Sequence, residues 1–496
     1  MAFNYAISGV FDLDQRWDAL PGNGSMYCVP TSATNWMYYY ATHGHPNALR
    51  YHAPAYQNHI PLNIGRMGNY MDTDAEDGTS SSDALEGLAD WLNDRNLPAF
   101  LYGKRAPDNG SLTYINLRNM LQENAQLIVV MGRYRREDGE FERRSGHAMS
   151  LVSLKRTDDG KITIGVHDPA QDDGNINAQS GFVVKNAALT EGFRNIEGDV
   201  VKVLRWGTDT SPYRFIDGYK AILPWFFFTN LTAGALTRYS ADIKTGEITT
   251  KQFPLPFNGE IADLALDPPM SRASVIARGS GEVWTLDVAE GSWSKTGGVS
   301  GAQLITYGGR RESLFVVQGR EIKSFDEEGR PLGRFDAGVS VDAVSYDQKN
   351  DRLVVASSAA KRLLAVAPGL QVLGQAEAPD VPGSGRLSLS VNGRDATILL
   401  TRQGSPEAAT VRWHATGALA TGRFRLLAQG PTSAAHINRK GRIYVSEAGK
   451  VAAFDTDGNR VTASVFDGLR AGPLLKVARS SYNLDEARSR RKEWKN

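Results

Sequence analysis

The first 230 residues combine helical and strand patterns of apolar positions. Residues 31–42 read TSATNWMYYYAT, with Pro30 at their start and Gly44 just beyond their end, and this arrangement predicts a helix. A second helix is expected over 79–93, where capping residues precede leucines at helical spacing. The same periodicity predicts a third helix over 113–125.

Strand patterns follow these helices along the chain. The segments 127–134, 147–156 and 161–170 are rich in apolar and β-branched residues, and turns containing glycine or aspartate separate them. Helices followed by strands are typical of an α+β domain, which we place at residues 1–230. The apolar stretch 221–236 is interpreted as a buried strand and linker, because Pro224 interrupts it.

The second half of the chain has no convincing helical pattern. A unit recurs there at roughly 40-residue spacing, which is the period of propeller blades. Each unit has an apolar strand, a turn, a second strand, and a third strand near an Asp-Gly type turn. The second strands of five complete units lie at 272–279, 312–319, 351–358, 395–402 and 441–448.

The two ends of this repeat region supply a sixth unit. Residues 236–253 provide its outer strands and 472–480 its inner strand, so the ends of a ring would join and few sheet edges would be exposed. We therefore expect an all-β, six-bladed β-propeller at residues 231–480, which resembles NHL- and YVTN-type repeat proteins in pattern only. Residues 481–496 form a basic tail that we expect to be solvated.

Composition narrows the function classes. The 496 residues carry a formal net charge of +1, which argues against a nucleic-acid partner, since that normally needs a basic face. No run approaches the roughly 18 apolar residues of a membrane span. The first residues have neither a positive region nor an apolar core, so they are not a signal peptide. A cytoplasmic location is the default expectation, and a secreted or cell-surface one applies if the chain is a mature form.

Cys28 is the single cysteine, so no intramolecular disulfide can form. A glycine-rich loop precedes it and a predicted helix follows, which would place its thiol at a helix N-terminus. The helix dipole there favours an anion and lowers a thiol pKa. Cys28 is thus a candidate nucleophile, and the alternative is a small buried hydrophobic residue.

His147 is the candidate base, at the start of a predicted strand and after Gly146. Asp168 ends the next strand, so an antiparallel pairing would bring its carboxylate beside the imidazole and orient the ring. The alternative for Asp168 is a turn residue before Pro169. His167 is a rival base, but it alternates with Asp168 along the strand and should face the other way.

Gln15 lies upstream of the cysteine, where a side-chain amide can complete an oxyanion hole with the Cys28 N–H. The ordered set Gln15, Cys28, His147 and Asp168 resembles the papain-like superfamily, and most closely the bacteriocin-processing (double-glycine leader) peptidases and their stand-alone relatives. The resemblance covers about residues 5–225. Its pieces are Q…CVPTSATNW, DGTSSSDALEGLADWL, LRNMLQENAQLIVVM and SGHAMSLVSL…KITIGVHDPA.

The resemblance implies a cysteine peptidase with Cys28 as nucleophile, His147 as base and acid, Asp168 as orienting residue and Gln15 as oxyanion donor. Val29 stands where the family has glycine, and the gap from Gln15 to Cys28 is longer than in the family. These departures leave open an inactive papain-like scaffold or binding protein. An amidase or acyl transferase is a further alternative, because the same triad would serve it.

No cofactor or metal ion is expected. His43, His45, His52 and His59 crowd one region without a ligand spacing that binds metal, and the acidic run 72–77 lacks the spacing of a calcium loop. The expected partners are a protein or peptide substrate and a protein bound on the propeller face. A catalytic propeller is the less favoured reading, because its sequence shows no cluster of carboxylates.

Overall fold

The computed structural model divides into two compact units, with the boundary between Pro224 and Trp225. The boundary expected at residue 230 therefore lies inside the strand that follows this point. The structure describes residues 2–43, 45–50, 56–95, 97, 99–108, 110–170, 183–207, 211–224, 226–232, 234–241, 247–267, 272–297, 299–309, 313–326, 328–348, 350–392, 396–413, 419–426, 428, 432–437, 443–461, 469–471 and 474–477.

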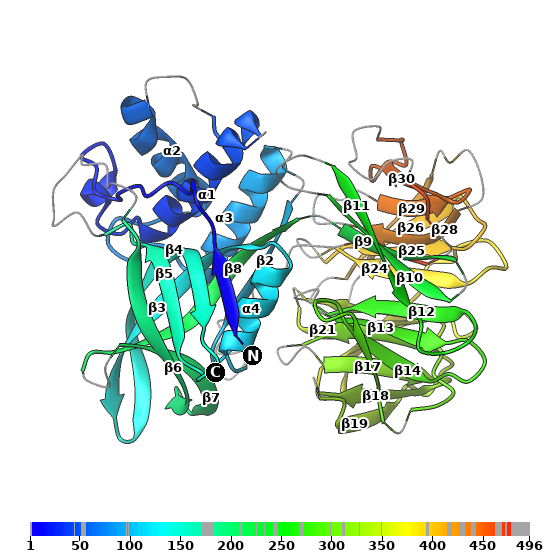
Figure 1. Ribbon diagram of the computed structural model, residues 1–496. Coiled ribbons are helices and arrows are strands. Elements are labelled where there is room, and N and C mark those ends of the chain that lie inside the picture. The colour runs from blue at the N-terminus through cyan, green and yellow to red at the C-terminus, as the bar shows by residue number, and fades with distance from the viewer. Residues whose placement is uncertain are drawn as a thin grey trace. The chain divides into compact units, whose positions relative to one another are not determined.

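The first unit is an α+β unit, as its sequence predicts. Its helices are α1 (Cys28–Thr42), α2 (Tyr56–Tyr70), α3 (Ser81–Asp94) and α4 (Tyr114–Gln122), with short 3-10 turns at Pro21–Gly24 and Pro46–Ala48. Its strands are β1 (Phe3–Ala6), β2 (Ala99–Arg105), β3 (Gln126–Glu137), β4 (Glu140–Arg156), β5 (Ile162–His167), β6 (Lys185–Ile196), β7 (Asp199–Trp206) and β8 (Tyr213–Pro224). Figure 1 shows α1, α2 and α3 gathered together beside β3, β4 and β5.

The sheet of the first unit closes on itself. Its strands follow the order β4-β3-β8-β7-β6-β5, and β5 pairs again with β4, while β1 and β2 add to the sheet at β4 and β8. Trp36 and Trp91 are fully buried among the helices, and Ile128 and Ala148 belong to the same core on the sheet side. This packing fixes the start of α1 against β4, where the candidate site lies.

The helix α2 is a finding that the sequence pattern did not predict. Pro61, Gly65 and Gly68 within it are poor helix formers. The two glycines are needed for packing, because a Cβ at Gly68 would lie 2.6 Å from the Tyr27 ring and one at Gly65 3.2 Å from Leu20. Tertiary contact therefore outweighs intrinsic propensity in this segment.

The second unit is all-β and propeller-like. Its described residues form six antiparallel sheets, which in sheet order are β11-β10-β9-β31, β12-β13-β14-β15, β16-β17-β18-β19, β20-β21-β22-β23, β24-β25-β26-β27 and β28-β29-β30. The bounds of these strands are β9 (Phe226–Thr232), β10 (Ala235–Ala241), β11 (Ile248–Pro254), β12 (Ile261–Leu266), β13 (Arg272–Ala277), β14 (Val283–Asp287), β15 (Ser292–Lys295), β16 (Leu304–Gly308), β17 (Ser313–Gln318), β18 (Glu321–Phe325), β19 (Pro331–Asp336), β20 (Ala343–Asp347), β21 (Arg352–Ser357), β22 (Arg362–Val366), β23 (Val372–Glu377), β24 (Leu387–Val391), β25 (Ile398–Arg402), β26 (Glu407–Trp413), β27 (Leu419–Arg425), β28 (Thr432–Ile437), β29 (Ile443–Glu447), β30 (Lys450–Phe454) and β31 (Leu475–Val477).

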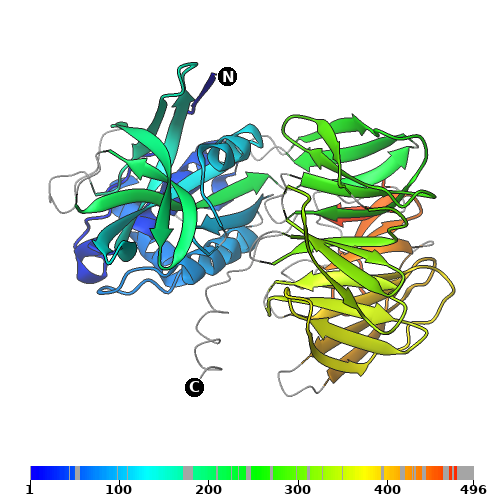
Figure 2. The same cartoon turned by 90° about the horizontal axis from the view of Figure 1, so that it is seen from below.

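The sheets of this unit are arranged as a closed ring. The strands β12, β16, β20, β24, β28 and β31 contact one another in that order, and β31 also contacts β12. In Figure 2 the sheets follow one another from green through yellow to orange, and the last strand, in red, returns to the first green sheet. The five second strands read from the sequence are β13, β17, β21, β25 and β29, and the prediction that the chain end completes the first sheet is confirmed by the pairing of β31 with β9.

No helix among the described residues is long and apolar enough to cross a bilayer. The basic tail 481–496 lies outside the described residues.

Candidate active site

Cys28 is the first residue of α1. The preceding loop includes Gly22 and Gly24 with positive φ, and Tyr27 at the N-cap makes no side-chain capping bond. The N–H groups in the first turn of a helix have no partner within the helix, and they concentrate positive potential at that end. Cys28 is partly exposed at this end of the helix.

The antiparallel pairing of β4 and β5 brings His147 and Asp168 together. His147 lies within β4, and Asp168 directly follows β5, whose last residue His167 pairs with Ser150. Nε2 of His147 lies 2.5 Å from Oδ1 of Asp168. The strand expected to begin at His147 extends back to Glu140, and His147 lies opposite Met131 in its pairing with β3.

The imidazole also forms a hydrogen bond with the thiol of Cys28. Because Nε2 is directed at Asp168, Nδ1 is the ring nitrogen that faces the sulfur. The structure thus brings three of the four predicted site residues into one hydrogen-bonded chain: Cys28, His147 and Asp168.

The charges of these groups shift one another's pKa values. Burial works to lower the pKa of His147, but its hydrogen bonds and charge interactions with Asp168 and Cys28 raise it to about 9. Burial works to raise the pKa of Cys28, but the hydrogen bond and charge of His147 prevail and lower it. Burial also opposes ionisation of Asp168, yet His147 and Lys185 hold the pKa of its carboxyl below the ordinary value. These directions favour a thiolate–imidazolium pair.

Lys185 is a member of the site that the sequence pattern did not reveal. Its Nζ donates to Oδ2 of Asp168 at 2.7 Å, and the N–H of Ala170 donates to Oδ1 at 3.1 Å. Lys185 is the first residue of β6, which pairs with β5 so that Lys185 lies opposite Val166. The carboxylate of Asp168 is therefore fixed through both of its oxygens.

The side-chain amide of Gln15 bonds to the loop that precedes Cys28. Nε2 donates to the carbonyl oxygens of Gly24 at 3.1 Å and Ser25 at 2.7 Å, and the backbone N–H of Gln15 donates to Pro169. The residue is 4% exposed. Gln15 thus ties the loop before Cys28 to the turn after Asp168. For its side-chain amide to donate to an oxyanion, one of these two hydrogen bonds of Nε2 would have to break.

Val29, the residue after Cys28, is part of the core. Its side chain is buried in the core shared by α1 and the sheet, and its backbone N–H interacts with the sulfur of Cys28. Further along α1, Oγ of Ser32 donates to the carbonyl of Ala148 at 3.1 Å. These contacts hold the first turns of α1 against the strand that carries His147.

The remaining candidate residues do not join this site. Nδ1 of His167 contacts the carbonyl oxygen of Phe11 at 3.1 Å, so His167 faces the N-terminal segment as its alternation with Asp168 predicts. His43 stacks on Tyr39, and His52 lies outside the described residues. Within the part of the chain that the structure describes, no group of three residues could hold a metal ion.

The acidic run 72–77 forms a turn. Oδ1 of Asp74 accepts hydrogen bonds from the backbone N–H groups of Glu76 and Asp77 at 2.6 and 2.9 Å.

Comparisons with known proteins show similarity of fold only. No family model matches this sequence, and no curated protein does. A protein of unknown function from Bacteroides caccae is 13% identical with a TM-score of 0.39, over 51% of this chain and 99% of that chain. A functionally unknown protein from Desulfotomaculum acetoxidans is 12% identical with a TM-score of 0.38, over 56% and 96% of the two chains. A β-propeller domain from Myceliophteria thermophila is 12% identical with a TM-score of 0.35, over 48% and 85%.

Proposed function

We propose that the first unit is a papain-like cysteine peptidase domain of the type found in double-glycine leader peptidases, and that it hydrolyses peptide bonds with Cys28, His147 and Asp168. One observation carries the proposal: the only thiol of the chain lies at the start of α1 and is hydrogen-bonded to an imidazole that a buried carboxylate orients. A nucleophile, a base and an orienting group in this order are the requirements of thiol acyl transfer.

The proposed reaction has two stages. The thiolate of Cys28 attacks the carbonyl carbon of the scissile amide, and the imidazolium of His147 gives its proton to the leaving amine as the C–N bond breaks. Water, deprotonated by His147, then attacks the thioester, which releases the carboxylic acid and returns the thiol. Asp168 stays ionised and keeps the imidazole in position.

The developing oxyanion would be stabilised by backbone N–H groups at the start of α1. They lie at the positive end of the helix, where a preorganised donor is effective because it needs no rearrangement. Gln15 would assist only after its amide leaves Gly24 or Ser25.

The propeller-like unit would then serve as a module that binds a substrate or a protein partner. Its inner strands follow one another around a ring, so their ends form a face built from several sheets. Such a face suits recognition of a ligand and needs no chemistry of its own.

Alkylation of Cys28 by iodoacetamide at pH 6, followed by intact mass, tests the triad. Cys28 is the single cysteine, so every adduct reports on it. An unperturbed thiol has a pKa near 8.5 and is under about 1% ionised at this pH, so the pair should make labelling roughly 100-fold faster. His147→Ala should remove this acceleration, and Asp168→Ala should reduce it.

His167→Gln is the matched control, since it changes a neighbouring histidine that does not contact the thiol. Slow labelling that is equal in all four folded proteins would contradict the triad and leave an inactive scaffold. Fast labelling opens a search for the cleaved bond. Analysis of the products then distinguishes peptide hydrolysis from acyl transfer to an amine or hydrolysis of a small amide.

A further inference from the structure

A cavity of about 160 Å³ lies at one end of the ring in the propeller-like unit. Many of its lining residues are the first residues of inner strands: Ile261 of β12, Leu304 of β16, Ala343 of β20, Leu387 of β24 and Leu475 of β31. Two further lining residues, Arg278 and Gln403, directly follow the ends of β13 and β25, which pair with β12 and β24. The cavity therefore opens at the face of the ring where the inner strands begin.

Arg386 is held in place across this cavity. Its Nη2 lies 2.9 Å from Oδ1 of Asp263, its Nη1 donates to the carbonyl of Ala262, and Oδ2 of Asp263 accepts from the N–H of Ile305. The carboxylate of Asp263 is buried, whereas 34% of the Arg386 side chain is exposed. The guanidinium group is thus fixed by Asp263 and Ala262, while the Arg386 side chain stays partly exposed.

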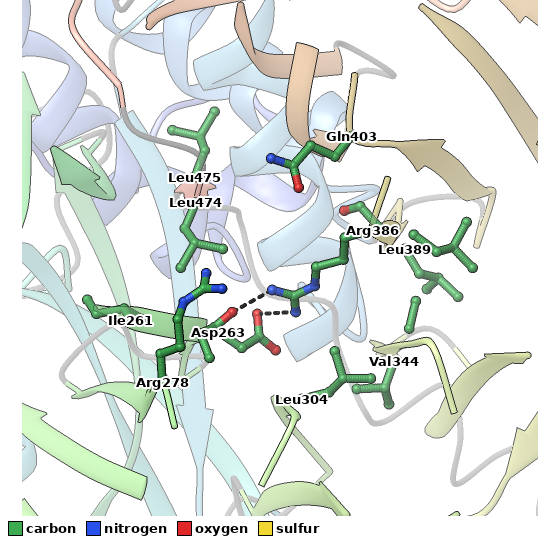
Figure 3. Close-up of a pocket in the computed structure, with 14 residues that line it drawn as sticks. Ile261, Asp263, Arg278, Leu304, Val344, Arg386, Leu389, Gln403, Leu474 and Leu475 are labelled. Carbon is green, nitrogen blue, oxygen red and sulfur yellow. Dashed lines mark hydrogen bonds and ion pairs between the residues drawn. The ribbon is translucent and has the colours of Figure 1, made fainter. Parts of the chain in front are cut away.

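Arg278 provides a second guanidinium group at the same opening, and Figure 3 shows both groups pointing into one space. Its Nε lies 3.0 Å from Oε2 of Glu260, but both side chains are more than 60% exposed. An ion pair this exposed is weak, so Arg278 can turn toward an incoming anion. Arg386 is paired with Asp263 and Arg278 with Glu260, so the opening gains a free positive charge only when Arg278 leaves Glu260.

Aliphatic side chains form one part of the wall, and Ser388 and Gln403 add polar groups to it. Leu304, Val344, Leu389, Leu474 and Leu475 surround the space, and the amide of Gln403 lies at its rim. A cavity of about 150 Å³ lined by aliphatic residues can hold a benzene-sized group. This cavity therefore accepts one apolar side chain beside a bound anion.

We propose that this cavity binds the carboxyl-terminal end of a peptide whose last side chain is apolar. The terminal carboxylate would pair with Arg278 and Arg386, the side chain would enter the leucine-lined space, and Gln403 would bond to the peptide backbone. The inference rests on the proposed function in one respect, namely that the natural ligand is a peptide substrate or product. The site itself needs no catalysis.

Calorimetric titration of the full chain carrying Cys28→Ser tests the proposal, because this variant cannot cleave the probe. The probes are acetyl-Gly-Gly-Leu with a free carboxylate, its carboxamide, acetyl-Gly-Gly-Asp, and 4-methylpentanoate. The free acid ending in leucine should bind at least tenfold more tightly than each of the other three. Equal binding of 4-methylpentanoate would overturn the assignment to a peptide, and equal binding of the carboxamide would overturn carboxylate recognition.

Two variants locate the site. Arg278→Gln should weaken binding of the leucine peptide about tenfold, and Ser388→Phe, which fills the cavity from β24, should abolish it. Arg320→Gln is the matched control, since Arg320 pairs with Asp336 outside this cavity and should leave binding unchanged. Unchanged binding in both cavity variants would overturn the proposal. The result is independent of Cys28 alkylation, so failure of the cavity and failure of the triad are distinguishable.

Discussion

Two features beside Cys28 account for the predicted reactivity of its thiol, namely the start of helix α1 and the side chain of His147. Peptide dipoles at the start of α1 favour the thiolate, and the imidazolium of His147 compensates its charge directly. Because the imidazolium is in turn bound to Asp168, the positive charge persists to a higher pH than that of a free histidine. The charge state of His147 should therefore decide whether the site attracts an anionic reagent.

The pH dependence of alkylation by two reagents checks this charge state. The pKa of His147 is raised to about 9, so the ring is charged below that pH and neutral above it. Anionic iodoacetate is attracted by the imidazolium and neutral iodoacetamide is not. We expect the rate constant for iodoacetate divided by that for iodoacetamide to be constant below about pH 8. Above it, this ratio should fall through a midpoint near pH 9. The step should be missing in His147→Ala, and a flat ratio in the wild-type protein would exclude the pair.

Removal of Lys185 should make the protein more sensitive to acid. The depressed pKa of Asp168 stabilises the fold above the ordinary carboxyl range, and this contribution is lost as the pH falls through the native pKa. Lys185→Met removes one cause of the depression, so the native pKa rises and the midpoint of acid unfolding should move to higher pH. Circular dichroism against pH measures the midpoint, and Lys185→Arg should restore it.

The control for Lys185 is Lys161→Met. Lys161 pairs with Asp159, and their side chains are 81% and 57% exposed, so its removal should leave the acid midpoint in place. A shift of equal size in both variants would show that net charge alone, rather than the contact with Asp168, controls acid stability.

Some residues of the candidate site can be predicted from the sequence, and others cannot, because their contacts depend on strand pairing or on the path of a loop. His147 and Asp168 lie at positions that one β-hairpin brings together, so their spacing alone indicates contact. Lys185 reaches Asp168 only through the pairing of β6 with β5, and the strand pattern of 185–196 is the available signal. The bonds of Gln15 to Gly24 and Ser25 depend on the path of a loop, which no periodicity describes.

In the loop from Gln15 to Cys28, the backbone packs so closely on itself that it leaves no room for a side chain at Gly24. Gly24 has φ +70°, and a Cβ there would lie 1.8 Å from the backbone oxygen of Gln15. The same loop receives the amide of Gln15 and leads directly into α1. The position of the thiol therefore depends on a backbone contact that only glycine permits.

Gly24→Ala should lower both stability and thiol reactivity. The positive φ alone costs about 1–2 kcal/mol for a residue with a Cβ, and the clash with Gln15 adds to it. Gly139→Ala is the matched control, because Gly139 has φ +87° and a Cβ added there would have nothing within 4 Å. We expect a larger shift of the urea midpoint in Gly24→Ala, and slower Cys28 alkylation in that variant only. Equal effects would show that backbone strain, not contact with Gln15, is the cause.

The elements also show where tertiary packing overrides sequence pattern. Of the four helices in the described part of the first unit, α1 is predictable from Pro30 near its start and Gly44 beyond its end, and α3 and α4 from apolar positions at helical spacing. The apolar positions of α2 also repeat at helical spacing, with Ile60, Ile64 and Met67 buried, but Pro61 inside the helix and two glycines conceal the pattern. Those glycines are explained by the side chains of Tyr27 and Leu20, which lie far away in sequence.

The ring of the second unit is closed by a junction between the first and last strands of that unit, β9 and β31. β31 pairs with β9, Oγ1 of Thr229 donates to the carbonyl of Leu474 at 2.7 Å, and the N–H of Leu474 donates to Asn230 at 2.9 Å. The repeat spacing makes this closure predictable, since five complete units leave an incomplete sixth at the ends. A ring that closes this way has no exposed inner edge there, so the junction should control its cooperativity.

Leu475→Asp should open this junction. Leu475 is 2% exposed in a cluster with Phe227 and Tyr444, and placing a carboxylate in this apolar cluster costs several kcal/mol. We expect a loss of at least about 3 kcal/mol in the unfolding of the second unit, measured by calorimetry of the full chain, together with faster proteolysis within it. Leu332→Asp is the control, because Leu332 lies on the outer strand β19 and is 49% exposed. Since the two substitutions add the same charge, equal destabilisation would contradict a specific role for the junction. Retention of Cys28 alkylation in Leu475→Asp would further show that the first unit keeps its site when the ring is weakened.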